Sequence, residues 1–416
     1  MVDDENLDSY RVGGSVRDEE LGKESNDDDF VVIGETRDGM LDRGFNLPVG
    51  ESFAVFIHPD TGDEWALGRK EKSTGDGYKD FEVVAGPDVT LEEDLSRRDL
   101  TINAMAKDTD TGELFDPHGG LDDLEDEVLR HVSPAFADDP LRVVRVAAFA
   151  ARMPTFDVHP ETAELCRSLV DQLDTIAPQR IQKELSKVFR LAEEPRRFFD
   201  VLESFGALEV LFPLIEEMTT VPAGPPEHHA EGTTFEHTMR VLEEAHNQMP
   251  DNKRVLWAAL GHDMGKVLTD ESELPNHPLH EKTGPDAVEE FADNIKLPNT
   301  HRKIMKDAAR FHMRFHQVDE LREATLIRMV DRFGEPNLTV DEFIALGVAD
   351  GLGREPQNVK GNVSKIRETL NATQQVIDEF GGDEAFEKFD LDPSDGEKIG
   401  DLILQERIRL LKDRSP

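Results

Sequence analysis

The spacing of apolar residues changes near Pro140, and this change restricts the architectures that the chain can adopt. Before it, short apolar runs such as residues 30–34 are broken by Gly, Pro and Asp, which predicts strands. A turn and the run 65–68 predict a hairpin over residues 53–68. Beyond Pro140, apolar residues recur with helical spacing. We therefore expect an α+β multidomain chain, with a mixed sheet and helices first and all-α regions after it.

Length and charge set further limits. A chain of 416 residues with 37% hydrophobic residues can form several domains with their own cores. The net charge is −42, whereas nucleic-acid binders are usually basic. One hypothesis is a halophilic protein, because in molar salt the Debye length falls to ~3 Å and an acidic surface no longer excludes phosphates. The alternative is a generic acidic surface, and activity measured against KCl concentration separates the two.

The cysteine content and the N-terminal segment bear on location. Cys166 is the only cysteine, so no intramolecular disulfide can form. Residues 1–10 are acidic and lack an apolar stretch, and no run approaches the ~18 apolar residues of a membrane span. We expect a cytoplasmic protein that is neither secreted nor inserted in a membrane.

Gly13 and Gly14 follow a short predicted strand and open a predicted helix. Backbone N–H groups at such a turn can approach a phosphate closely, and Arg17, one turn into the helix, can pair with the anion. A Gly-Gly turn taken alone is equally compatible with a structural role.

Three consecutive aspartates, residues 27–29, directly precede an apolar run. Side chains alternate along a strand, so Asp27 and Asp29 share a face while Asp28 points away. Two carboxylates on one face suit two Mg²⁺ ions that also bind a nucleoside triphosphate. A solvated acidic turn is the alternative, and the neighbouring Gly-Gly turn favours the metal site. Glu64, in the returning strand, is a candidate third carboxylate.

These segments, with further blocks in the same order, resemble the head of the class II polymerase-β-like nucleotidyltransferases, the CCA-adding enzymes and bacterial poly(A) polymerases. The blocks are Gly13-Gly14-Ser15-Val16-Arg17-Asp18, Asp27-x-Asp29, Arg97-Arg98-Asp99 within residues 95–104, residues 116–124, and Asp138-Asp139-Pro140-Leu141-Arg142. The resemblance implies that the Arg-Arg-Asp motif holds the ribose and that residues 116–124 form the hinge between head and neck.

The last of these blocks carries a donor and acceptor pair. Asp139 and Arg142 lie three residues apart on a predicted helix, so both can face the Watson–Crick edge of a base. A surface salt bridge is the alternative for an isolated pair. In the family this motif replaces a template and selects CTP and then ATP. The nucleotide-binding residues implied by the resemblance are Gly14, Arg17, Arg98, Asp139, Arg142 and Arg145.

The implied reaction is attack of the tRNA 3′-hydroxyl on the α-phosphate of CTP or ATP, with release of pyrophosphate. Mg²⁺ at Asp27 and Asp29 would activate the hydroxyl and neutralise the leaving group. Residues 69–81 are predicted to form a polar loop after the hairpin, and in the family a loop here permits the switch from C to A addition.

Three positions depart from the family pattern. Asp138 stands where Glu is usual, Asn26 stands where Lys is common, and Ala148 replaces an Arg of close bacterial relatives. The last change puts one nucleotide or tRNA phosphate contact in doubt, while the metal and templating positions are retained.

Most of the histidines follow residues 221–226, a Pro-rich and Gly-rich stretch predicted to be a linker. The adjacent His262 and Asp263, on a predicted helix, can close a mixed nitrogen and oxygen metal site with an earlier His and a distant Asp. The ordered set resembles the HD-superfamily phosphohydrolases. The resemblance implies the ligands His237, His262, Asp263 and Asp350, with His280 and His312 as further ligands or phosphate contacts.

A divalent transition metal such as Ni²⁺ or Mn²⁺ would activate water at this site toward a phosphomonoester or a 2′,3′-cyclic phosphodiester. The catalytic residues implied for the two sites are Asp27 and Asp29 in the head and His262 and Asp263 in the HD region. We expect three further histidines to be surface or loop residues: His229, His277 and His316.

Head and HD unit in one chain match the long bacterial form of the CCA-adding enzymes, which implies phosphatase, 2′-nucleotidase and cyclic phosphodiesterase activities as well. The predicted domains are a head (1–138), a helical neck and body with the templating helix and an RNA-binding surface (139–225), an HD domain (226–355) and a helical tail (356–416). The implied partners are tRNA, CTP and ATP, with no membrane, for a monomer or homodimer.

Three alternatives remain open. A poly(A) polymerase would share the head motifs but would not use CTP. An HD phosphohydrolase whose head is only regulatory would hydrolyse phosphoesters without dependence on CTP. A tRNA-sensing protein with an inactive head is disfavoured by the intact Asp27 and Asp29.

Overall fold

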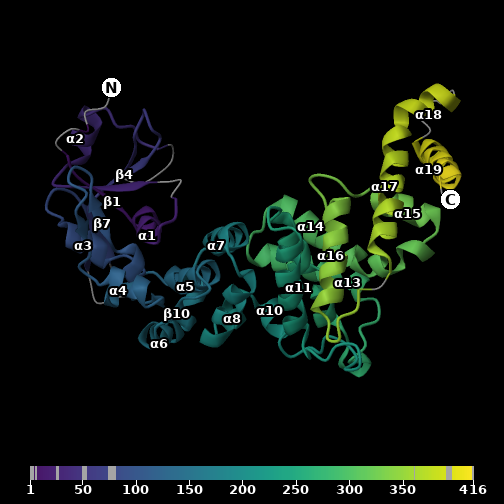
Figure 1. Cartoon of the computed structure of the whole chain (residues 1–416), viewed down its shortest axis with the longest axis horizontal. Helices are drawn as coiled ribbons and strands as arrows, with labels where there is room; N and C mark the ends of the chain where they lie inside the picture. The colour runs from purple at the N-terminus through teal and green to yellow at the C-terminus, as the bar shows by residue number, and fades with distance from the viewer. Residues whose placement is uncertain are drawn as a thin grey trace. The chain divides into compact units, whose positions relative to one another are not determined.

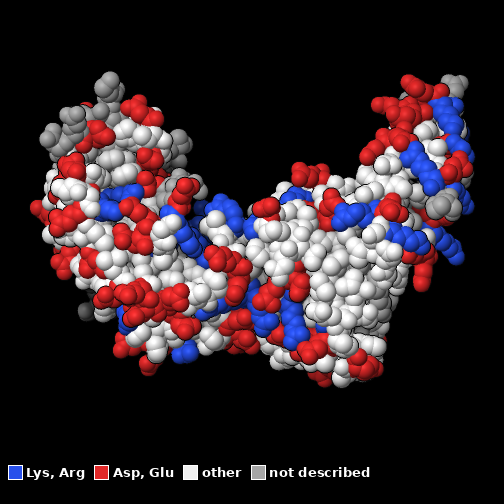
Figure 2. Space-filling view, viewed as in Figure 1, with Lys and Arg blue, Asp and Glu red and all other residues white. Residues whose placement is uncertain are grey.

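The computed structural model describes residues 4, 7–24, 28–48, 54–73, 81–359, 361–389 and 396–414 (Figure 1). The chain forms two compact units, residues 1–176 with 204–207, and residues 177–203 with 208–416. Acidic side chains cover much of the visible surface of both units, as the net charge of −42 requires (Figure 2).

The first unit is built on a mixed sheet. Its strands are β1 (Asp8–Val12), β2 (Asp29–Ile33), β3 (Val55–Ile57), β4 (Glu64–Leu67), β5 (Arg69–Ser73), β6 (Phe81–Ala85), β7 (Ala106–Asp108), β8 (Leu114–Phe115), β9 (Val128–Leu129) and β10 (Asp157–Val158). Six strands form one sheet in the order β3-β4-β2-β1-β7-β8. β2 runs parallel to β4, and β1 is antiparallel to both β2 and β7. The antiparallel pairing of β3 with β4 confirms the predicted hairpin.

Helices cover this sheet on both faces because successive strand residues point to opposite sides. Val32 packs with Phe56 and Trp65, whereas its neighbour Val31 packs with Leu91 and Leu95. The helices of the unit are α1 (Gly14–Glu20), α2 (Arg37–Asp42), α3 (Leu91–Ser96), α4 (Gly120–Glu125), α5 (Leu141–Arg152) and α6 (Pro160–Ser168), with 3-10 helices at Thr101–Asn103, Pro134–Asp138 and Val170–Thr175. The start of α5 confirms the change of period predicted near Pro140.

The prediction of a polar loop over residues 69–81 is wrong for residues 69–73 and for residue 81, which belong to strands. β5 and β6 pair in antiparallel register from Arg69 opposite Ala85 to Ser73 opposite Phe81. The first four residues of β5 are all charged, so the strand lacks the apolar pattern on which the prediction of strands relied. Residues 74–80 lie outside the described residues.

The second unit is helical, as the spacing beyond Pro140 predicts. Its α-helices are α7 (Pro178–Leu191), α8 (Pro195–Phe205, whose end belongs to the first unit), α9 (Leu208–Leu211), α10 (Pro213–Glu217), α11 (Thr234–Gln248), α12 (Arg254–Gly261), α13 (His280–Asn294), α14 (Asn299–Phe311), α15 (Glu323–Val330), α16 (Val340–Gly353), α17 (Val363–Glu379), α18 (Gly382–Phe389) and α19 (Gly396–Arg414). Its 3-10 helices are Met264–Leu268, Glu271–Glu273 and His312–Glu320. Among the described residues, no helix combines the length and apolar character that crossing a bilayer requires.

Residues 221–226, predicted to be a linker, are instead packed into the second unit. Ala223 is buried, and its carbonyl accepts a hydrogen bond of 2.6 Å from Lys266 Nζ. The Pro222 carbonyl faces His277 Nε2 at 2.7 Å. The small side chains and prolines of residues 221–226 therefore allow their backbone to lie close to the HD motif.

Candidate active sites

The Gly-Gly turn joins β1 to α1 in the first unit. Gly13 has a φ of 75°, in the left-handed region that favours glycine. A Cβ atom added there would lie 3.1 Å from Arg98 Nη1, so the turn leaves room for the second arginine of the Arg-Arg-Asp motif. The turn predicted from sequence is thus in contact with a residue 85 positions later in the chain.

A buried network joins three of the predicted nucleotide-binding elements. Arg17 Nη1 donates to Asn103 Oδ1 at 2.7 Å, and Asn103 Nδ2 donates to Asp99 Oδ1 at 3.1 Å. Arg145 Nε donates to Asp99 Oδ2 at 2.7 Å. Burial opposes the ionisation of Asp99, yet Arg145 holds its pKa below the ordinary value. The ring of Phe149 lies under the guanidinium groups of both Arg17 and Arg145.

Asp94 on α3 connects the Arg-Arg-Asp motif to the base of the β5–β6 hairpin. Its Oδ1 accepts hydrogen bonds from the backbone N–H of Arg69, at 3.0 Å, and from Arg97 Nη2, also at 3.0 Å. Its Oδ2 accepts from Arg98 Nη2 at 3.2 Å. The carboxylate is 1% exposed, and although burial opposes ionisation, Arg98 and Arg97 lower its pKa. Sequence analysis did not single out Asp94, since acidic residues are common in this chain.

Asp139 and Arg142 do not form the helical pair predicted from sequence. Asp139 precedes α5 in extended conformation, and its carboxylate accepts from the Leu141 backbone N–H at 3.1 Å. Arg142 is buried and donates to the carbonyls of Ala135 and Arg97. The pair is therefore split between the end of a 3-10 helix and the first turn of α5, because Pro140 stands at the N-cap.

Asp29 is the first residue of β2 and is exposed. The register places it opposite Glu64 on β4, so the candidate third carboxylate is its direct neighbour on the sheet. The carboxylate of Asp28 instead lies 3.8 Å from the guanidinium group of Arg11 on β1. Asp27 lies outside the described residues. No metal is described at these residues, and the oxygen donors that are present suit Mg²⁺.

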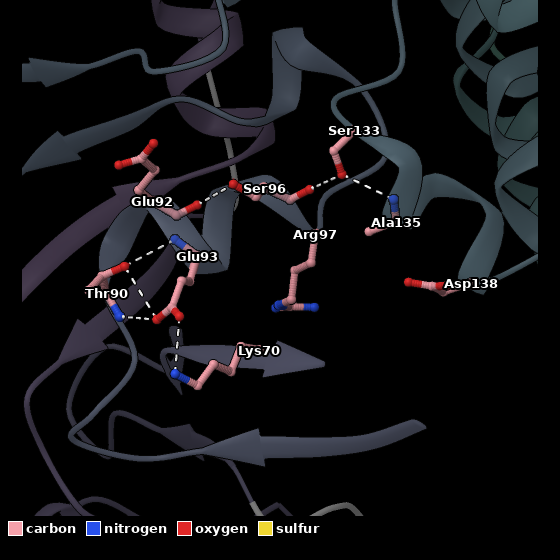
Figure 3. Close-up of a pocket in the computed structure, with 9 residues that line it drawn as sticks. All are labelled: Lys70, Thr90, Glu92, Glu93, Ser96, Arg97, Ser133, Ala135 and Asp138. Atoms are coloured by element: carbon pink, nitrogen blue, oxygen red, sulfur yellow. Dashed lines mark hydrogen bonds and ion pairs between the residues drawn. The ribbon is translucent and has the colours of Figure 1, made fainter. Parts of the chain in front are cut away.

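An open pocket of about 410 Å³ lies beside these elements (Figure 3). The Arg97 guanidinium and the Asp138 carboxylate both point into it, and Lys70 closes another side through an ion pair of 3.0 Å with Glu93. The pocket thus combines cations from the hairpin and from the Arg-Arg-Asp motif. Its lining residues are Lys70, Thr90, Glu92, Glu93, Ser96, Arg97, Ser133, Ala135 and Asp138. Of these, Arg97 belongs to the Arg-Arg-Asp motif that is predicted to hold the ribose.

In the second unit, His262 and Asp263 lie just after the end of α12, not on a helix as predicted. His262 is the cap that follows α12, His280 is the first residue of α13, and His312 follows the last residue of α14. Gly265 permits this convergence, because a Cβ atom there would lie 2.2 Å from the His280 carbonyl. His237 on α11 and Asp350 on α16 complete the cluster, and these helices pack together in Figure 1.

Asp263 stands at the centre of the six predicted residues. Its Oδ2 lies 3.3 Å from His262 Nε2 and 3.6 Å from His237 Nε2. Its Oδ1 lies 3.4 Å from His280 Nε2 and 3.2 Å from His312 Nε2. Burial opposes ionisation, but Lys266 and His262 hold the pKa of Asp263 well below its usual range. The structure thus brings all the predicted HD residues into one buried cluster.

Asp350 also contacts His316 and Arg354, two residues that were not predicted to belong to the cluster. Asp350 Oδ1 lies 3.2 Å from His237 Nε2, and Oδ2 lies 3.1 Å from His316 Nε2. Arg354, one helical turn later, donates to Asp350 Oδ2 at 2.9 Å. His316 was predicted to be a surface or loop residue, and it is instead partly buried against Asp350. The position of His316, four residues after His312, could have indicated from the sequence that it lies near the cluster.

Glu231 faces the other side of His237. Its Oε1 lies 3.0 Å from His237 Nδ1 and 2.7 Å from His229 Nδ1, and its Oε2 accepts from the Glu355 backbone N–H at 2.8 Å. The Glu231 side chain has no exposed surface. His229 lies in a loop, as predicted, but its side chain is packed against Glu231. His277, which contacts Thr269 and Pro222, lies in a loop as expected.

Comparison with known proteins agrees with this arrangement. Family models described as "Poly A polymerase head domain", "Probable RNA and SrmB- binding site of polymerase A" and "HD domain" match residues 9–130, 155–219 and 234–335. A "Multifunctional CCA protein" of Methylococcus capsulatus is 45% identical over 354 residues, 83% of this chain and 82% of that protein. A protein of the same name from Pseudomonas fluorescens is 41% identical over 413 residues, 97% of each chain.

Solved structures share the fold at lower identity. A CCA-adding enzyme in an apo form gives a TM-score of 0.65 at 21% identity, over 98% of this chain and 88% of that chain. A Thermotoga maritima CCA-adding enzyme complexed with tRNA gives 0.60 at 20% identity, over 99% and 88%. The identity to the curated relatives spans both the head and the HD region, so the chain belongs to the family of multifunctional CCA proteins.

Proposed function

We propose that this protein adds the CCA sequence to tRNA 3′ ends from CTP and ATP, without a nucleic-acid template. The observation that carries the proposal is the network of Arg17, Asp99 and Arg145 beside the Gly13 turn, in a chain of this family. Solved relatives of the same fold are complexes with tRNA, ATP and CTP, which supports these partners. Mg²⁺ at Asp27 and Asp29 would supply charge neutralisation for the transfer.

Different residues of the head would bind the phosphates, the ribose and the base of the nucleotide. Backbone N–H groups at Gly13 and Gly14 and the guanidinium of Arg17 would hold phosphates, while Arg98 would hold the ribose. Asp139 and Arg142 would select the base. Arg142 donates to the carbonyls of Ala135 and Arg97, so the position of its guanidinium group depends on the position of the Arg-Arg-Asp motif.

The test is incorporation of labelled CTP and ATP, separately and together, on tRNA that ends before CCA, with Mg²⁺ at low and at molar KCl. We expect two C residues and then one A. Tails of A without use of CTP would instead identify a poly(A) polymerase. Strongest activity in molar KCl would support the halophilic hypothesis, and an optimum at low salt would exclude it.

We further propose that the HD cluster hydrolyses phosphomonoesters and 2′,3′-cyclic phosphodiesters with a divalent transition metal such as Ni²⁺ or Mn²⁺. His237, His262, Asp263 and Asp350 provide the mixed nitrogen and oxygen donors that such ions accept. The test is release of phosphate or opening of the cyclic ester after reloading the chelated protein with each metal. Asp263→Asn should remove this activity, and retention of full activity in the variant would place the chemistry elsewhere.

The domain assignment follows from these functions. We propose a head over residues 1–138, a neck and body that carry base selection and RNA binding over 139–225, an HD domain over 226–355 and a tail over 356–416. The cytoplasmic location and the monomeric or homodimeric state stay predictions.

A further inference from the structure

Arg11 on β1 lies on the face of the sheet opposite to the candidate metal-binding carboxylates of the head. The register of β1 and β2 pairs Arg11 with Phe30 and Val12 with Asp29. Residues directly opposite each other share a face, and neighbours along a strand point to opposite faces. Phe30 and Val12 pack in different core clusters, one on each face. Arg11 therefore shares a face with Phe30, while Asp29 and its neighbour Glu64 share the other.

The Asp28 side chain lies on the same side as Arg11. Its Oδ1 atom is 3.8 Å from Arg11 Nη1, and the side chain as a whole is 40% exposed. Asp28 Oδ1 and Arg11 Nε are both shielded from solvent, and neither has a hydrogen-bond partner in the part of the chain that the structure describes. Arg11 thus offers the ionised carboxylate of Asp28 an opposite charge in a place that water does not reach.

Arg11 is itself held by residues of α1 and β7. Its Nη2 forms an ion pair with Glu19, near the end of α1, and Lys107 on β7 forms an ion pair with the same carboxylate. Lys107 also lies 3.7 Å from Glu20. One guanidinium group therefore contacts two carboxylates through two nitrogens, so the position of α1 also determines where Arg11 meets Asp28.

The position of Asp28 matters because it stands between two candidate metal ligands. Residues 27–29 are three consecutive aspartates, and like charges this close repel one another. Mg²⁺ in nucleotide sites usually takes one or two carboxylates and leaves its other positions to water and phosphates. A third carboxylate on the metal face would therefore compete with the phosphates of the nucleotide for the ion.

We propose that Arg11 is a positioning residue for nucleotide transfer. It holds Asp28 on the face of the sheet that lies away from Asp29, so that an ion at Asp27 and Asp29 keeps positions open for the nucleotide. Arg11 acts through Asp28 and contacts neither the ion nor the nucleotide. The inference rests on the proposed function for the metal site of the head.

The experiment compares Arg11→Met, Asp28→Asn, the double variant and Lys107→Met in the full chain. Binding of Mn²⁺ is followed by electron paramagnetic resonance. Only the binding that disappears when Asp29→Ala is added to the same protein is counted, so that the HD cluster does not contribute. In Arg11→Met the site loses a nearby positive charge and gains a freed carboxylate. We expect its Mn²⁺ affinity to rise by about 3- to 5-fold, the range of an exposed ion pair.

The second readout is kcat for nucleotide incorporation at saturating metal. We expect Arg11→Met to lower kcat by about 10-fold, as for other groups that orient a metal ligand. Adding Asp28→Asn should restore it, because the competing carboxylate is then absent. Lys107→Met removes an ion pair of the same network without facing Asp28, and it should leave both readouts unchanged.

Two results would overturn the proposal. A purely structural role of Arg11 would lower Mn²⁺ affinity and kcat together, and Asp28→Asn would not restore kcat. Unchanged readouts in Arg11→Met would show that Asp28 keeps its position without Arg11. Arg11→Gln repeats the test should Arg11→Met fail to fold. Absence of Asp29-dependent Mn²⁺ binding in the wild type would overturn the proposed metal site of the head as well, which distinguishes that failure from the other two.

Discussion

The head and the HD cluster hold their polar groups in opposite ways. In the head, Arg17, Arg142 and Arg145 already donate to carboxylates, amides or carbonyls of the chain. In the HD cluster, the Nε2 atoms of His280 and His312 face one another and a carboxylate oxygen of Asp263. These three guanidinium groups of the head therefore already have hydrogen-bond partners in the chain, whereas the polar atoms of the HD cluster are mostly the nitrogens and oxygens that a cation accepts as ligands.

This difference bears on how the head would select a nucleotide and how the HD cluster would bind a cation. Where a ligand in the head replaces a partner within the chain, one hydrogen bond is exchanged for a similar one, so the net gain in binding free energy is small. In the HD cluster, the nitrogen and oxygen atoms already converge in the folded chain. We therefore expect a cation to bind there without a comparable exchange of hydrogen bonds. Substitutions should consequently act on selectivity and local stability in the head, and on metal content in the HD cluster.

The largest effect is expected for Arg142→Met. Charge-assisted hydrogen bonds contribute ~1.5–3 kcal/mol each, so losing the two bonds to Ala135 and Arg97 costs about 4 kcal/mol, roughly 1000-fold in an equilibrium constant. Amide hydrogen exchange, followed peptide by peptide, should show faster exchange around α5 and α3. Exchange in α11 to α16 should stay unchanged, and equal loss of protection there would refute the separation of the two units.

Glu231→Gln should weaken metal binding by about 10- to 100-fold, the effect usual for a group that orients a metal-ligating histidine. The amide keeps the size of the side chain but removes the charge that faces His237 Nδ1 at 3.0 Å. Competition with a coloured chelator measures the affinity. Glu227→Gln, an exposed residue four positions earlier, is the control. Unchanged affinity in Glu231→Gln would mean that backbone packing alone orients His237.

Arg145→Met should destabilise the head by about 2 kcal/mol at neutral pH, less than the usual ~3–5 kcal/mol for a broken buried pair because Arg145 is partly exposed. In the wild type the Asp99 pKa is depressed, so its contribution to stability is present above ~3.9 and is lost as pH falls through the folded-state pKa. Without Arg145, burial raises this pKa and the loss begins at higher pH. Exchange rates near Asp99 measured from about pH 7 downward check the shift; identical profiles would contradict it.

Asp94→Asn should give the smallest effect, about a 10-fold rise in KM, the equivalent of ~1.4 kcal/mol. The amide can accept fewer hydrogen bonds from Arg69, Arg97 and Arg98, and so loosens the hairpin base and the motif together. We expect A addition to fall more than C addition, measured with each nucleotide separately. Asp122→Asn, at an exposed position of the same unit, is the control. A uniform loss of kcat with unchanged KM would indicate a purely structural role.

Sequence analysis succeeded where a local pattern reflects local structure. The hairpin of β3 and β4, the start of α5 and the HD residues all follow from alternation, helical spacing or residue type. It failed where long-range contacts decide. The charged β5 is a strand because β6 and α3 hold it, and residues 221–226 are packed because Lys266 binds the Ala223 carbonyl.

The same limit applied to residues of the sites. Glu231 and Asp94 act through partners that are distant in sequence, and in a chain with 89 acidic residues neither was distinguishable by type. His316 and Arg354 lay one helical turn from predicted residues, a signal that spacing could have supplied.

We expect the two proposed sites of this chain to act independently of each other. The most direct measurement follows nucleotide incorporation into tRNA and hydrolysis of a 2′,3′-cyclic phosphate in parallel, for Asp29→Ala and for Asp263→Asn. The account predicts that Asp29→Ala abolishes incorporation and retains hydrolysis, and that Asp263→Asn does the reverse. Loss of both activities in either variant, with both proteins folded, would contradict it.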